Sequence, residues 1–184
     1  MADVQKGHHV VIYAGASGVG TAAIQLCKLL GAHPWAVVSS AEKGKICEEV
    51  GAEGVVFYKD NENWAKELIK KKGGNFTTVL DCIGPSNADS TLDLLEVDGK
   101  WILYGLLSGA KAKINLAITL FKRINIISTT LKTRTDEYKA NLVDDFRMTA
   151  LPGFDNQILK PIIYKKYICD WNSVDPFIQA HKLM

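Results

Sequence analysis

Short apolar runs alternate with amphipathic segments along the whole chain. The first run, residues 8–14, is almost continuous Val, Ile and Tyr, which is typical of a strand buried on both faces. Similar runs predict further strands over 34–39, 54–58, 77–84, 99–107, 124–131 and 161–168. Such runs, separated by helical patterns, predict a parallel sheet with helices on both faces.

Apolar residues at helical spacing fill most of the intervals between these runs. They predict helices over 18–30, 41–50, 64–72, 87–95 and 135–149, and a last helix that begins near Ser173. Ser86 is the expected N-cap of the fourth helix. In the first helix the expected apolar face is Val19, Ala22, Ala23, Leu26 and Leu30, with Thr21, Gln25 and Lys28 on the other face.

The repeated strand–helix–strand order determines the expected fold class. Successive parallel strands require right-handed crossovers, and these place helices on both sides of the sheet. The sequence shows no internal repeat, low-complexity tract or linker. We therefore expect an α/β protein with a Rossmann-type, doubly wound parallel sheet in one domain, residues 1–184.

Composition narrows the possible partners. The chain is 47% hydrophobic with a formal net charge of +2, which favours neither a nucleic acid nor a membrane surface as partner. It has no apolar run long enough to span a bilayer. Cys27, Cys47, Cys82 and Cys169 lack the spacing of a zinc site or a disulfide framework. These features predict a cytoplasmic protein without a metal site.

A glycine-rich turn joins the first strand to the first helix. It reads Gly15-Ala16-Ser17-Gly18-Val19-Gly20, so Gly15 and Gly20 match the outer glycines of the dinucleotide-binding pattern G-x-G-x-x-G, and Ser17 takes the middle position. A small residue there still lets a pyrophosphate approach the free N–H groups of the helix N-terminus. The other interpretation is a turn that only needs flexibility. The turn is not a Walker A loop, because Gly-Lys-Ser/Thr is missing.

The end of the second strand indicates which dinucleotide binds. NAD-binding domains usually place an acidic residue there, about 20 residues past the turn, on the ribose hydroxyls. Here Ser39 and Ser40 take that place, and Lys43 follows closely. Hydroxyl groups and an ammonium suit a 2′-phosphate, which a carboxylate would repel. The sequence therefore predicts NADPH, although the neighbouring Glu42 leaves NADH open.

Several motifs together resemble one family. They are "AGASGVGTAAIQLCKLLGA" (14–32), "DCIG" (81–84), "GKWILYGLLSG" (99–109), "LFKR" (120–123) and "IQAHKLM" (178–184). Over nearly all of its length the chain resembles the cofactor domain of the zinc-independent medium-chain dehydrogenase/reductases, in particular the quinone oxidoreductases. The resemblance implies that the cofactor is bound by Gly15, Ser17, Gly18, Val19, Gly20, Ser39, Lys43, Tyr58, Cys82, Ile83, Gly84, Tyr104, Gly105 and Leu106.

The resemblance also implies a reaction, hydride transfer from NADPH to a quinone or a related enone. A 2-enoyl thioester reductase of the same superfamily and a non-catalytic NADPH-binding sensor remain alternatives. Family members carry a GroES-like domain before the first strand, whereas only residues 1–7 precede it here. We therefore expect a cofactor domain from a longer enzyme, with no catalytic residue of its own and little activity alone. The strand over 124–131 is a candidate homodimer contact by the same resemblance.

A short-chain dehydrogenase is the remaining enzyme class with a similar glycine turn. Its chemistry needs a tyrosine followed by lysine four residues later, because the ammonium lowers the pKa of the phenol. None of the six tyrosines has lysine at that position. The sequence therefore excludes this mechanism.

Overall fold

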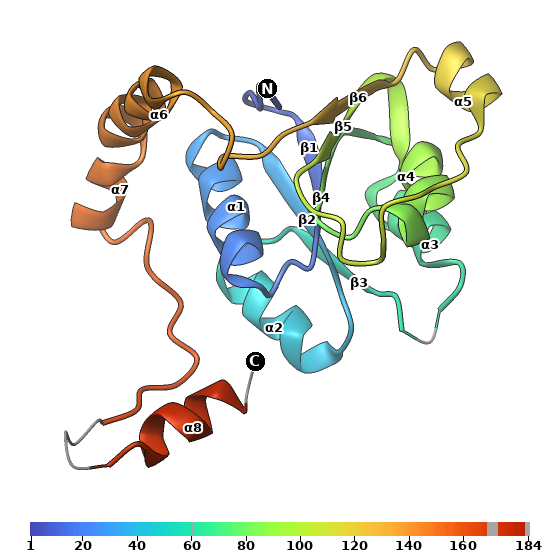
Figure 1. Cartoon of the computed structure of the whole chain (residues 1–184). Coiled ribbons are helices and arrows are strands. Elements are labelled where there is room, and N and C mark those ends of the chain that lie inside the picture. The colour runs from blue at the N-terminus through green and yellow to red at the C-terminus, as the bar shows by residue number, and fades with distance from the viewer. Residues whose placement is uncertain (60, 169–172, 183–184) are drawn as a thin grey trace.

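Six parallel strands form one sheet (Figure 1). The computed structural model describes residues 1–59, 61–168 and 173–182. The strands are β1 (His9–Tyr13), β2 (His33–Val38), β3 (Gly54–Phe57), β4 (Phe76–Asp81), β5 (Leu95–Leu103) and β6 (Asn125–Ser128). Their order is β3-β2-β1-β4-β5-β6, the order of a doubly wound dinucleotide-binding sheet. The predicted fold class is confirmed.

Helices connect the strands and continue after the last one. They are α1 (Gly18–Leu29), α2 (Ala41–Glu49), α3 (Trp64–Lys72), the 3-10 turn η1 (Pro85–Asn87), α4 (Ala88–Leu94), α5 (Leu116–Phe121), α6 (Asp136–Thr149), α7 (Leu151–Asp155) and α8 (Asp175–His181). Within the described residues, every helix is too short or too polar to cross a membrane.

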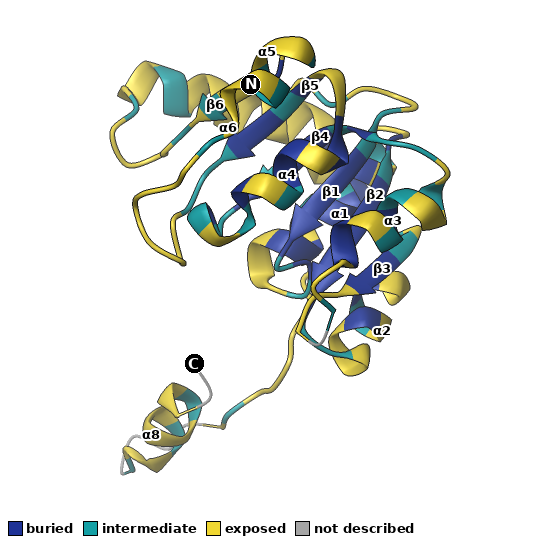
Figure 2. Cartoon of the chain, turned by 90° about the vertical axis from the view of Figure 1, so that its right-hand side faces the viewer, coloured by how far each residue is buried: buried dark blue, intermediate teal, exposed yellow. Residues whose placement is uncertain are grey.

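The sheet buries a separate apolar core on each face. Successive side chains of a strand point to opposite faces. Val10 and Ile12 of β1 therefore join the core beneath α1 and α2, whereas Val11 and Tyr13 join the core beneath α3 and α4. Figure 1 shows the two helix pairs on opposite sides of the sheet, and Figure 2 shows that the buried residues concentrate in its central strands.

The expected buried face of α1 is wrong. Thr21, Ile24, Gln25 and Cys27 are buried, whereas Val19 is 60% exposed. Gly20, which has no side chain, lets the helix lie close to the sheet, and hydrogen bonds satisfy the buried polar groups of Thr21 and Gln25. Thr21 donates to the carbonyl oxygen of Ser17 over 3.1 Å. Helical spacing identifies a helix correctly, but here it does not identify which stripe faces the sheet.

Three other local predictions also fail. Residues 161–168 form no strand: they extend away from the sheet, and Ile168 is 93% exposed. The strand predicted over 99–107 instead runs from Leu95 to Leu103 as β5. Its first residue, Leu95, is fully buried beside Phe76 of β4. Ser86 lies inside η1 and does not cap α4. A strand needs a neighbour to pair with, and residues 161–168 have none among the described residues.

Candidate functional site

The N-terminus of α1 faces the carboxyl edge of the sheet. Ser17 is its N-cap, and the Ser17 hydroxyl accepts a hydrogen bond of 3.0 Å from the Gly20 amide. Gly18 and Val19 are the first residues of α1, so their amides have no carbonyl partner within the helix and are available to an anion. The helix dipole adds positive potential at the same place.

The outer glycines of the turn are required by close packing. A Cβ atom on Gly15 would lie 2.7 Å from the Cβ of Ala36 in β2. A Cβ on Gly20 would collide with the carbonyl oxygens of Ala14 and Gly15, so this glycine lets α1 pack against the end of β1. At Gly18 a Cβ would meet no atom within 4 Å. Gly20 therefore has a packing role, and Gly18 lies beside open space.

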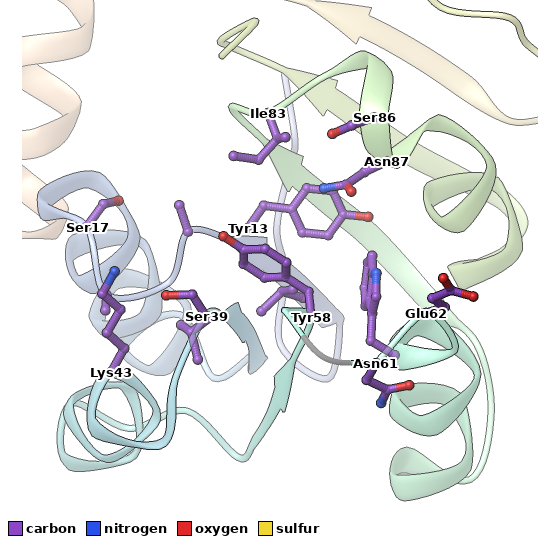
Figure 3. Close-up of a pocket in the computed structure, with 15 residues that line it drawn as sticks. Tyr13, Ser17, Ser39, Lys43, Tyr58, Asn61, Glu62, Ile83, Ser86 and Asn87 are labelled. Carbon is purple, nitrogen blue, oxygen red and sulfur yellow. The ribbon is translucent and has the colours of Figure 1, made fainter. Parts of the chain in front are cut away.

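A cavity of about 610 Å³ opens beside this turn (Figure 3). Five predicted binding residues line it: Ser17, Ser39, Lys43, Tyr58 and Ile83. They come from α1, the end of β2, α2, the end of β3 and the end of β4. This is the edge where open parallel sheets bind ligands, because all the strands end there.

The two serines after β2 have different roles. Ser40 is the N-cap of α2, and its hydroxyl accepts from the Lys43 amide over 3.4 Å. Ser39 instead lines the cavity together with the Lys43 side chain. Glu42 is in the first turn of α2 and is not among the described residues that line the cavity. The cavity therefore presents hydroxyl groups and an ammonium at the end of β2.

Asp81 holds the turn after β4. Its side chain is fully buried and accepts hydrogen bonds from the Ile83 amide at 2.6 Å, the Gly84 amide at 2.9 Å and the Trp101 indole at 2.9 Å. Burial raises the pKa of the Asp81 carboxyl above its ordinary value, and these three donors counter that rise. The carboxyl group thus fixes the backbone that presents Ile83 to the cavity.

The other predicted residues lie in turns beside the cavity rather than on its wall. The Leu107 amide donates to the Cys82 carbonyl oxygen over 3.1 Å, which joins the turns after β4 and β5. A Cβ on Gly105 would lie 2.8 Å from the same oxygen. These predicted residues are Cys82, Gly84, Tyr104, Gly105 and Leu106. The predicted residues Gly15, Gly18, Val19 and Gly20, in the glycine turn and the start of α1, also lie outside the wall.

Tyr104 directly follows β5 and is half-buried. Burial raises the pKa of the Tyr104 hydroxyl above its ordinary value, and the nearby Cys82 and Asp81 raise it further. The phenol therefore stays protonated at neutral pH and can donate a hydrogen bond.

Sequence reasoning missed much of the far wall of the cavity. Its further lining includes Tyr13, Asn61, Glu62, Trp64, Ser86 and Asn87. These residues follow β3 or β4, or end β1. Their position just after strand ends was the available signal, since parallel strands bring their carboxyl ends to one edge. Their side-chain directions had no signal in the sequence.

The described residues contain no cluster of three or more His, Cys, Asp or Glu side chains that could hold a metal ion. Cys27, Cys47 and Cys82 are free thiols. Cys169, Leu183 and Met184 lie outside the described residues. Independence from zinc remains a prediction.

Two curated relatives match parts of the chain. It is 30% identical to a quinone oxidoreductase of Pseudomonas aeruginosa over 117 residues, 63% of this chain and 36% of that protein. It is 29% identical to an acryloyl-coenzyme A reductase of Sulfurisphaera tokodaii over 134 residues, 72% of this chain and 38% of that protein. The matched part is thus well under half the length of each relative.

Solved structures share the fold. A mycobacterial protein solved as a complex with NADPH superimposes with a TM-score of 0.73 at 25% identity, over 85% of this chain and 48% of that one. The family model for zinc-binding dehydrogenases matches residues 18–146, which include α1, the carboxyl edge of the sheet and β6. With well over half of its length matched by this model, the chain belongs to the zinc-binding dehydrogenase family.

Proposed function

We propose that this chain binds NADPH at the carboxyl edge of its sheet and serves as the cofactor domain of a reductase. One observation carries the proposal: the α1 N-terminus, Ser39 and Lys43 all face one cavity. The α1 amides suit the pyrophosphate, and the Ser39 hydroxyl and Lys43 ammonium suit a 2′-phosphate. The NADPH complex of the mycobacterial protein supports the same choice of cofactor.

The residues of the turns after β4 and β5 would hold the other half of the cofactor. When bound, NADPH supplies a hydride. Ile83 and Gly84 would orient the ribose, and Asp81 keeps their backbone in place. Tyr104 and Gly105 would contact the nicotinamide side, where the close approach of Gly105 to Cys82 leaves no room for a side chain. The chain's contribution is orientation and the exclusion of water.

Parallel titrations with NADPH and NADH test the cofactor assignment. We expect Lys43→Ala to weaken NADPH binding about tenfold, the equivalent of one charge-assisted hydrogen bond, and to leave NADH binding unchanged. Lys45→Ala, in the same helix but outside the cavity lining, is the matched control. Equal affinities of the wild-type chain for the two nucleotides, or no effect of Lys43→Ala, would contradict the proposal.

For the substrate we propose a quinone or a related conjugated carbonyl compound. The quinone oxidoreductase relative supports this choice, and the acryloyl-coenzyme A reductase relative supports the alternative, a 2-enoyl thioester. An assay of quinones and enoyl thioesters on a longer protein that carries this domain distinguishes them. Saturation with NADPH and no reduction of either class would instead favour a non-catalytic sensor.

We also propose that β6 can join two copies of the chain. It is an edge strand, and Ile126 is 39% exposed. The opposite edge, β3, is protected: the Lys71 ammonium donates to the Val55 carbonyl oxygen over 3.1 Å. Sedimentation of the full chain tests this, with Ile126→Lys expected to favour the monomer.

A further inference from the structure

The cavity has two chemically different sides (Figure 3). Ser17, Ser39 and Lys43 lie on one side, where the anionic groups of the proposed cofactor belong. On the other side lie Glu62 and Asn61, and Tyr13 and Tyr58 lie between the two groups. A carboxylate repels a phosphate, so a contact of Glu62 with the proposed cofactor would be to a different part of it.

Residues 61–64, which include Glu62, are held in place by their neighbours. The Asn61 side-chain amide donates to Glu67 over 2.6 Å, and its oxygen accepts from the Asn63 amide over 2.9 Å. Trp64, at the start of α3, is 6% exposed and packs edge-on against Tyr13. The backbone at Glu62 is therefore fixed between two anchored residues.

The Glu62 carboxylate itself is available. Within residues 1–59, 61–168 and 173–182 it forms no hydrogen bond and no ion pair, although it lines the cavity. Asn61, in contrast, uses both ends of its amide on the loop. Of these two side chains, Glu62 is the one with an acceptor to offer a ligand.

Asn87 supplies a second polar group from the wall above. The backbone amide of Asn87 donates to the Gly84 carbonyl oxygen over 3.1 Å. The backbone carbonyl oxygen of Asn87 accepts from the Thr91 hydroxyl over 2.8 Å. Thr91 in turn is hydrogen-bonded to the Tyr13 hydroxyl over 2.8 Å. In the described part of the chain, the Asn87 side-chain amide has no hydrogen-bond partner. It is a donor and an acceptor on a fixed backbone.

We infer that Glu62 makes this site selective for a 6-aminopurine over a 6-oxopurine. The inference rests on the proposed binding of NADPH. The aromatic side chains of Tyr13, Tyr58 and Trp64 suit a planar base between the two polar sides. The 6-amino group of adenine donates a hydrogen bond to a carboxylate. The 6-oxo group of hypoxanthine is itself an acceptor, so it repels a carboxylate placed opposite it. The Asn87 amide can pair with either base by turning over, so discrimination falls to Glu62.

The test compares NADPH with its hypoxanthine analogue in calorimetric titrations of the full chain. For the wild-type chain we expect NADPH to bind about tenfold more tightly than the analogue. Glu62→Gln should reduce this ratio to about twofold or less, because a glutamine amide can accept from the amino group or donate to the oxo group. Glu49→Gln removes the same charge at the end of α2 and should keep the wild-type ratio.

The outcomes separate this inference from the proposed function. A wild-type ratio near one, or a ratio unchanged in Glu62→Gln, overturns the role of Glu62 while NADPH binding that depends on Lys43 still stands. If neither nucleotide binds, or if Lys43→Ala has no effect, the proposed function fails and the inference fails with it.

Discussion

The sheet region, residues 9–128, and the C-terminal region, residues 129–182, follow similar sequence patterns but differ in burial. In the first region the strands and α1–α4 enclose two apolar cores (Figure 2). In the second, every residue of α6 and α8 is at least partly exposed. Figure 2 shows α8 well away from the sheet.

This difference shows that a helix and a core have different physical origins. α6 has good local signals: the Thr135 hydroxyl caps it by accepting from the Tyr138 amide over 3.2 Å, and Asp136 and Glu137 are in its first turn. Its apolar side chains Leu142 and Phe146 nevertheless remain 44% exposed. Local sequence suffices to form the helix, whereas burial requires another surface opposite it.

The largest expected effect is the loss of stability when a leucine of the sheet region is truncated, compared with the same change in the C-terminal region. Leu92 of α4 is fully buried, so Leu92→Ala should lower the free energy of unfolding by about 2–5 kcal/mol. Leu142→Ala in α6 should lower it by about 0.5 kcal/mol or less. Chemical denaturation of the two variants measures both values. A loss above about 1 kcal/mol for Leu142→Ala would mean that α6 packs against a surface in solution.

A smaller effect is expected where the two regions are joined. The buried Gln25 side chain of α1 donates to the Lys160 carbonyl oxygen over 3.1 Å and accepts from the Lys160 amide over 2.9 Å. Gln25→Leu keeps the side-chain volume but removes both hydrogen bonds. The free energy that keeps residues 156–168 attached to α1 should then fall by about 1–2 kcal/mol. Limited proteolysis should then cut residues 156–168 faster.

The control for this junction is Asn156→Leu, a change at an exposed position of the same segment. It should leave the cleavage rate as in the wild type. Equal cleavage of the wild-type chain and Gln25→Leu would show that α1 does not anchor the segment.

The smallest expected effect is the pH dependence of the sheet region. His9 and His33 stack with ring centroids 4.6 Å apart, and burial, together with Lys72 and His33, lowers the pKa of His9 below 6.5. The unfolded chain then binds this proton at a higher pH than the folded chain does. Stability should therefore fall, by about 1 kcal/mol or less, as the pH drops from about 7.5 through 6.5.

A second group acts at lower pH. Burial alone would raise the pKa of Glu53, but hydrogen bonds from His33 and Lys28 lower it below 4.5 overall. Its contribution is present above about pH 4.5 and is lost as the pH falls further. Thermal unfolding from pH 7.5 to 5.5 measures the His9 effect above the range in which Glu53 acts. His9→Phe should flatten the dependence of stability on pH, and His181→Gln in α8 should not. An unchanged slope in His9→Phe would contradict this assignment.

Most of the sheet could be predicted because its signals are local. Continuous apolar runs such as 8–14 and 34–39 can be buried only in the middle of a sheet, so β1 and β2 agree with prediction to within a few residues. The same holds for the glycine turn, where Gly20 permits the close approach of α1. Ser39 and Ile83 closely follow strand ends, and both line the cavity, whereas their role in binding stays a prediction.

The errors occur where the decisive contact is distant in the sequence. Gln25 has the spacing of a solvent-facing residue, yet it is buried because Lys160 supplies backbone partners 135 positions away. The run over 161–168 has the composition of a strand, but no strand lies beside it in the described part of the chain. Glu62 had no motif, and its place on the cavity wall depends on how Asn61 and Trp64 anchor its loop.

By itself, the sequence determined the order of the strands that form the sheet, their parallel direction and the glycine turn at the start of α1. These depend on periodicity and backbone sterics within a few residues. The tertiary structure alone decided which stripe of α1 is buried, which serine faces the cavity and which polar side chains form its far wall. Those outcomes depend on the relative positions of separate elements, because burial and hydrogen bonding are satisfied by whichever surface lies opposite.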